Sequence, residues 1–77
     1  MQATTTVLRL NWQAFDARCL ERGWERAQDR AAALGVSEAM ISRARQINWP
    51  ASPRLVAACT RVFGADSYGD LFRAVQS

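Results

Sequence analysis

The chain has 77 residues, enough for one small domain, and 49% of them are hydrophobic, so a folded core is expected and disorder is not. The formal net charge is +3, with arginine as the sole basic residue type, and this favours an acidic partner such as nucleic acid. Histidine is absent, and Cys19 and Cys59 stand far apart in no CxxC spacing, which argues against a metal site.

Both cysteines fall at apolar-face positions of expected helices, so we interpret them as small, reduced core residues. No apolar run approaches the roughly 18 residues needed to span a bilayer. The start of the chain lacks the charged and then apolar regions of a secretion signal. These observations predict a cytoplasmic protein with no membrane partner.

The first ten residues are expected to form an extended segment that precedes the domain at residues 11–77. Residues 4–10 are rich in threonine, valine and leucine, which favours extended backbone. Nothing within the chain is an obvious strand partner. The segment is therefore expected either to pack on the domain or to pair with the same segment of a second subunit.

Two helices are expected next. Asn11 is a typical N-cap, and apolar residues follow it at helical spacing until Gly23 ends the first helix. Trp24 and Glu25 lead into a second helix that Gly35 ends, and the negative charge of Glu25 near its start suits the helix dipole. Its inner face is expected to contain Ala27, Ala31 and Leu34.

Three further helical segments complete the chain. A third helix is expected from about Ser37 to Gln46, with Met40, Ile41 and Ala44 on its inner side. A fourth begins at Ser52-Pro53, a cap followed by proline at the first helical position, and ends at Gly64. A fifth is expected to start at Ser67 with Leu71, Phe72 and Val75 facing the core.

The stretch from the second to the third of these helices is the most informative part of the sequence. Ala31 allows a neighbouring helix to approach closely, and Gly35 can take the left-handed conformation that ends a helix abruptly. Ser37 then caps the third helix, and Ile41 is expected to pack that helix against the second. This pattern is typical of a helix-turn-helix, which commonly presents its second helix to the DNA major groove.

The chain resembles the Cro/cI-type (XRE) family of phage and bacterial regulators. The residues that carry this resemblance are Gly35-Val36-Ser37, Ile41-Ser42-Arg43, Pro50-Ala51-Ser52, Phe63-Gly64-Ala65-Asp66-Ser67 and Asp70-Leu71-Phe72-Arg73. The resemblance covers roughly residues 11–75. It implies an all-α fold: a compact bundle of about five short helices with a helix-turn-helix, as in lambda-repressor-like DNA-binding domains.

Three positions depart from the family pattern. Arg30 stands where an apolar residue is usual, so its stem is expected along the core edge with its charge reaching solvent or a phosphate. The usual polar start of the second helix is replaced, and Gln28 takes the place of the phosphate-contacting glutamine. Ile47 replaces the glycine that commonly ends the third helix.

Arg18, Arg22 and Arg61 are expected to be ordinary surface charges, while the roles of Arg9 and Arg73 stay open.

The outer face of the third helix is expected to contact DNA bases. Arg43 can bind guanine and Gln46 adenine with two hydrogen bonds each, Glu38 can accept from cytosine, and Ala39 can pack on a thymine methyl group. The predicted base contacts are Glu38, Ala39, Ser42, Arg43 and Gln46. The predicted phosphate contacts are Arg26, Gln28, Ser37, Arg45, Asn48, Trp49, Ser52 and Arg54.

The resemblance implies a transcriptional repressor that occupies double-stranded operator DNA, as a homodimer, in the cytoplasm of a bacterial host. An antitoxin that regulates its own operon is one alternative, and a protein-interaction module that does not bind DNA is another. An enzyme is not expected, because the sequence shows no nucleophile–base pair, metal-ligand set or phosphate loop. No cofactor, metal or small-molecule substrate is expected either.

Overall fold

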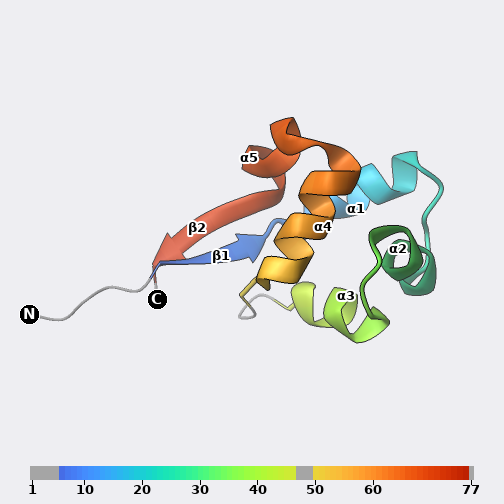
Figure 1. Ribbon diagram of the computed structural model, residues 1–77, viewed down its shortest axis with the longest axis horizontal. Coiled ribbons are helices and arrows are strands. Elements are labelled where there is room, and N and C mark those ends of the chain that lie inside the picture. The colour runs from blue at the N-terminus through green and yellow to red at the C-terminus, as the bar shows by residue number, and fades with distance from the viewer. Residues whose placement is uncertain (1–5, 47–49, 77) are drawn as a thin grey trace, which may run out of the picture.

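The computed structural model describes residues 6–46 and 50–76 (Figure 1). Most of the chain is helical. In order, the elements are β1 (Thr6–Leu10), α1 (Trp12–Glu21), α2 (Ala27–Leu34), α3 (Glu38–Ala44), α4 (Pro53–Phe63), a 3-10 turn (Ala65–Ser67), α5 (Tyr68–Leu71) and β2 (Phe72–Gln76). The helices form one body, and the two strands extend from it as a narrow ribbon (Figure 1).

The two-stranded sheet corrects the all-α prediction. β1 pairs antiparallel with β2, with Leu10 opposite Phe72 and Val7 opposite Val75. The pairing continues into the helical body, where the Asn11 N–H donates to the Leu71 carbonyl at 2.7 Å. The extended segment therefore has a partner within the chain, contrary to the expectation from the sequence.

The expected fifth helix is correspondingly wrong at its end. α5 stops at Leu71, and the backbone of Phe72 is already extended, with φ of −125° and ψ of 139°. Phe72 and Val75 have a spacing that fits one helical turn, but both belong to β2 and pair with β1, while the Phe72 N–H donates to the Tyr68 carbonyl as the C-cap of α5. Both Leu71 and Phe72 are nevertheless buried, as predicted.

Side-chain caps fix the starts of three helices where the sequence predicted them. The Asn11 side chain accepts a hydrogen bond from the Ala14 N–H at 3.3 Å at the start of α1. The Ser37 hydroxyl accepts from the Met40 N–H at 3.1 Å, and the Ser52 hydroxyl accepts from the Leu55 N–H at 3.2 Å. Each bond satisfies a backbone donor that the first helical turn cannot pair.

The start of α2 has no side-chain cap. The helix begins at Ala27, after Trp24 and Glu25, and its N-cap residue, Arg26, makes no side-chain capping bond. The Trp24 N–H instead donates to the Cys19 carbonyl at 2.9 Å, which folds this residue back onto the end of α1. The centre of the Trp24 ring lies 6.0 Å from that of the Phe63 ring, so Trp24 packs against the end of α4.

The core lies between the helices. Its largest fully buried side chains are Phe15, Leu34, Ile41, Leu55 and Leu71, together with Cys19 and Cys59. Both cysteines are free thiols, as predicted. Burial raises the pKa of the Cys59 thiol to about 12, because a thiolate loses its hydration there.

Arg30 is buried, which corrects the expectation that its charge would reach solvent or a phosphate. Only 5% of the residue is exposed. Its guanidinium forms an ion pair with Asp16 of α1 at 2.7 Å and donates from Nε to the Trp24 carbonyl at 2.9 Å. It also lies 5.6 Å from the centre of the Trp12 ring. A carboxylate, a carbonyl and an aromatic face thus replace the water that this cation loses.

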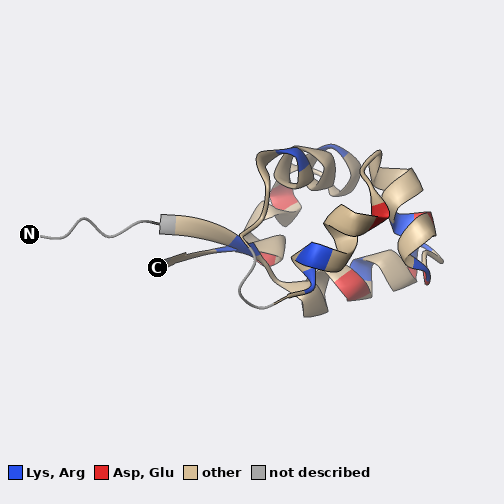
Figure 2. Ribbon diagram, turned by 90° about the horizontal axis from the view of Figure 1, so that it is seen from below, with Lys and Arg blue, Asp and Glu red and all other residues tan. Residues whose placement is uncertain are grey.

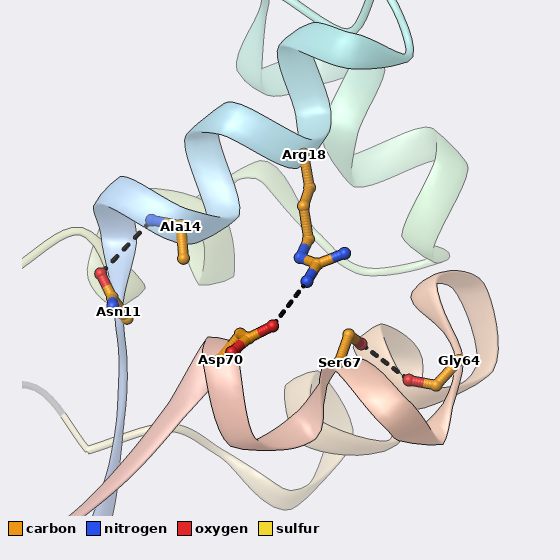
Figure 3. A network of polar contacts seen from close by, with 6 residues as sticks. All are labelled: Asn11, Ala14, Arg18, Gly64, Ser67 and Asp70. Carbon is orange, nitrogen blue, oxygen red and sulfur yellow. Dashed lines mark hydrogen bonds and ion pairs between the residues drawn. The ribbon is translucent and has the colours of Figure 1, made fainter.

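Arginines occur on the helices and at the base of the ribbon, with acidic positions between them (Figure 2). Three that were expected to be plain surface charges connect separate elements. Arg18 of α1 binds Asp70 of α5 at 2.9 Å (Figure 3). Arg61 of α4 donates to the Leu34 carbonyl at 2.8 Å, and the Arg22 guanidinium lies 4.7 Å from the centre of the Phe63 ring.

Candidate nucleic-acid interface

α2 and α3 are joined by a three-residue connection and pack against each other (Figure 1). Gly35 ends α2 in the left-handed conformation, with φ of 72° and ψ of 31°, and its neighbour Val36 donates to the Ala31 carbonyl at 3.0 Å. Ala31 and Ile41 are buried where the two helices face the core. The close approach, the left-handed glycine and the cap therefore occur at the positions that the sequence indicated.

The outer face of α3 is open to solvent. Ile41 and Ala44 are buried in the core and Met40 packs partly against it, so the other four positions of this seven-residue helix are exposed. All of the predicted base-contacting residues are exposed: Glu38, Ala39, Ser42, Arg43 and Gln46. This surface offers a carboxylate, a guanidinium, a hydroxyl and an amide side by side, which is a mixed set of donors and acceptors for the edges of bases.

The predicted phosphate contacts fall into three groups. Those that are exposed are Arg26, Gln28, Ser37, Arg45 and Arg54, and the Ser37 hydroxyl also caps α3. Ser52 is half-buried, and its hydroxyl donates to the Met40 sulfur at 3.6 Å besides capping α4, so it is already engaged. Asn48 and Trp49 lie outside the described residues, as does Ile47.

The exposed arginines of this set stand at helix ends. Arg26 is the N-cap of α2, Arg45 is the C-cap of α3, and Arg54 lies in the first turn of α4. The Arg45 guanidinium lies 5.8 Å from the centre of the Trp12 ring, which limits the positions that it can take. Asp29, in the first turn of α2, is an exposed negative charge that opposes phosphate binding there.

The structure also brings together basic residues that the sequence left unassigned. Arg9 of β1 and Arg73 of β2 stand opposite each other in the ribbon. Together with Arg45 they line an open groove of about 630 Å³ between the ribbon, the start of α1 and the end of α3. We call this concavity the ribbon groove. No local sequence signal joins these residues, because the strand pairing that aligns them is not visible in the sequence.

Within residues 6–46 and 50–76, no helix is both long and apolar enough to cross a membrane. In the same residues, no group of three or more His, Cys, Asp or Glu side chains is placed to hold a metal ion. Comparison of the chain with protein-family models, with curated proteins and with solved structures finds no match. The chemistry of the interface therefore has to be argued from the chain's own residues.

Proposed function

We propose that this protein is a sequence-specific double-stranded DNA-binding transcriptional regulator of the Cro/cI type, and that α2 and α3 form its helix-turn-helix. One observation carries the proposal: α3 buries Ile41 and Ala44 against the core while its whole polar face stays exposed. A helix of seven residues is about 10 Å long, which suits insertion of its first turns into a major groove about 12 Å wide.

In this proposal α3 lies in the major groove and reads base edges. Arg43 binds guanine O6 and N7 through two donors, and Gln46 pairs with adenine in the same bidentate manner. Each such contact discriminates against a wrong base by about 1–3 kcal/mol. Glu38 accepts from a cytosine amine, and its charge repels guanine and thymine, whose major-groove edges offer acceptors without a donor.

Affinity in this proposal comes from arginines at the helix ends. Arg26, Arg45 and Arg54 contact phosphates on either side of α3, and the first N–H groups of α2 add a partial positive charge. The segment from Arg26 to Arg54 holds five arginines and two acidic residues, so its excess of +3 equals that of the whole chain. A homodimer on a pseudo-palindromic operator would repress by blocking polymerase, with half-sites about one helical turn apart.

The first experiment is selection of bound fragments from a genomic DNA library, followed by measurement of affinity across a salt series. Affinity is expected to fall steeply as salt rises, because phosphate contacts release counterions. A protein that shows no salt-sensitive binding to any fragment refutes the proposal. In that case a specific protein recovered with the chain would favour a protein-interaction module that does not bind DNA.

The second experiment uses Arg43→Ala. The substitution is expected to weaken binding to the selected site by roughly 10- to 100-fold, as for the loss of one bidentate base contact, and binding to random DNA by much less. Arg22→Ala is the matched control, since Arg22 lies against Trp24 and Phe63 rather than on α3. Equal losses on both DNAs would reassign Arg43 to a phosphate contact.

A further inference from the structure

The ribbon groove combines positive charge with a concave shape. β1 and β2 supply Arg9 and Arg73, the start of α1 supplies Trp12, and the end of α3 supplies Arg45 and Gln46. No aspartate or glutamate is among the described residues that line it. The two ion pairs described above use Asp16 and Asp70, neither of which borders this groove.

The central feature of the groove is a pair of like charges. Arg9 and Arg73 are direct cross-strand partners, so both side chains leave the same face of the ribbon. Like charges directly opposite each other destabilise a strand pair. A groove lined by two arginines and by no aspartate or glutamate of the described residues is suited to an oxyanion, and a phosphate group can accept two parallel hydrogen bonds from a guanidinium.

The groove is continuous with the outer face of α3. Gln46 belongs both to the predicted base-contacting face and to the wall of the groove, and Arg45 precedes it at the C-cap. Arg45 also borders a neighbouring concavity that contains Asp16 and Glu25. Arg9 and Arg73 are therefore the charged residues that line the ribbon groove but not this neighbouring concavity.

We propose that Arg9 and Arg73 bind a backbone phosphate of the DNA, beyond the bases that α3 contacts, so that the ribbon forms a second contact with the duplex. This inference rests on the proposed function and extends it to a part of the chain outside α2 and α3. The phosphate that reaches the groove lies past Gln46, at the C-terminal end of α3. The contact adds affinity without sequence preference, because phosphates carry no base identity.

The experiment compares Arg9→Gln/Arg73→Gln with the unaltered protein on the selected DNA site. The expected loss is about tenfold at low salt, and the slope of log affinity against log salt becomes less negative by about 1, the value for one phosphate contact. Losses on the selected site and on random DNA are expected to be equal. Arg22→Gln is the control for removal of a charge elsewhere, and it is expected to leave the slope unchanged.

Three further results decide between the alternatives. An unchanged salt slope in the double variant, with Arg43→Ala still selective, overturns this inference and leaves the proposed function standing. No DNA binding by the unaltered protein overturns both. Saturable calorimetric binding of sodium pyrophosphate that Arg9→Gln/Arg73→Gln abolishes, with DNA affinity unaffected, assigns the groove to a free phosphate ligand and also overturns the inference.

Folding of the double variant is checked by thermal unfolding. Removing two like charges that stand opposite each other is expected to change the melting temperature by only a few degrees, because like charges across a strand pair add no stability. A loss of DNA affinity accompanied by a large fall in melting temperature would overturn the inference in favour of a structural role for the pair.

Discussion

Replacement of Asp16 tests the buried ion pair that joins α1 to α2. Asp16→Asn keeps the size of the side chain and removes its charge, which leaves the Arg30 cation without its counter-ion. The Arg30 side chain is 6% exposed, whereas that of Asp16 is 39% exposed. The cation is thus the partner that depends on the pair, because water can hydrate the carboxylate but hardly reaches the guanidinium.

The expected cost follows from these exposures. Breaking a fully buried ion pair by removing one partner costs about 3–5 kcal/mol. Here the exposed side of Asp16 admits some water, and the bonds of Arg30 to the Trp24 carbonyl and to the Trp12 ring remain. We therefore expect a loss of about 2 kcal/mol, which corresponds to a fall in melting temperature of about 10 °C for a domain of this size.

The assay is urea denaturation followed by circular dichroism, in a double-mutant cycle with Arg30→Met. The double variant Asp16→Asn/Arg30→Met is expected to lie within about 1 kcal/mol of the unaltered protein, because it removes both charges and retains apolar volume. Glu21→Gln, an exposed substitution in the same helix, is the control and is expected to change little. If Asp16→Asn costs no more than this control, the argument that the pair compensates a buried charge is refuted.

Two further predictions concern Gly35 and Cys59. Gly35→Ala is expected to cost about 1–2 kcal/mol, because a left-handed φ of 72° is strained for any residue with a Cβ, although the added atom would lie at an ordinary 3.6 Å from Arg61. Thermal unfolding measures this, with Gly69→Ala as the control in open space; equal effects of the two would contradict it. Burial raises the pKa of Cys59 to about 12, so the thiol of the native protein stays protonated at a pH where the thiol of the unfolded chain, with a pKa of about 8.5, ionises. The free energy of unfolding is therefore expected to fall as the pH rises from about 8.5 toward 12. Urea unfolding at pH 8 and pH 10 checks this, and Cys59→Ala should show a smaller fall; an equal fall would argue against it.

The features that could be predicted from the sequence are those set by neighbouring residues. The caps at Asn11, Ser37 and Ser52 each depend on a side chain and a backbone N–H three positions later. The end of α2 depends on Gly35, which takes the left-handed conformation. The burial of Ile41 and Ala44, and hence the exposed face of α3, follows from helical spacing alone. The role of that face in binding DNA stays a prediction.

The features that could not be predicted depend on contacts between distant parts of the chain. Phe72 and Val75 fit a helical turn as well as a strand, and only the pairing with β1, at the other end of the sequence, decides for the strand. Arg30 at an apolar position is a local signal that a counter-ion is needed, but the sequence does not show that Asp16 supplies it. The same limit applies to the ribbon groove, whose two arginines lie in separate strands.

The first and last elements of the fold are partners, and this places every helix inside one closed loop of chain. Closing a loop of this length costs on the order of 4 kcal/mol in chain entropy. Helix pairs such as α2 and α3 are close in sequence and form their contacts at far smaller entropic cost. We therefore expect the helical body to form first and the two ends to join last, which would bring the arginine pair of the ribbon together at the final step of folding.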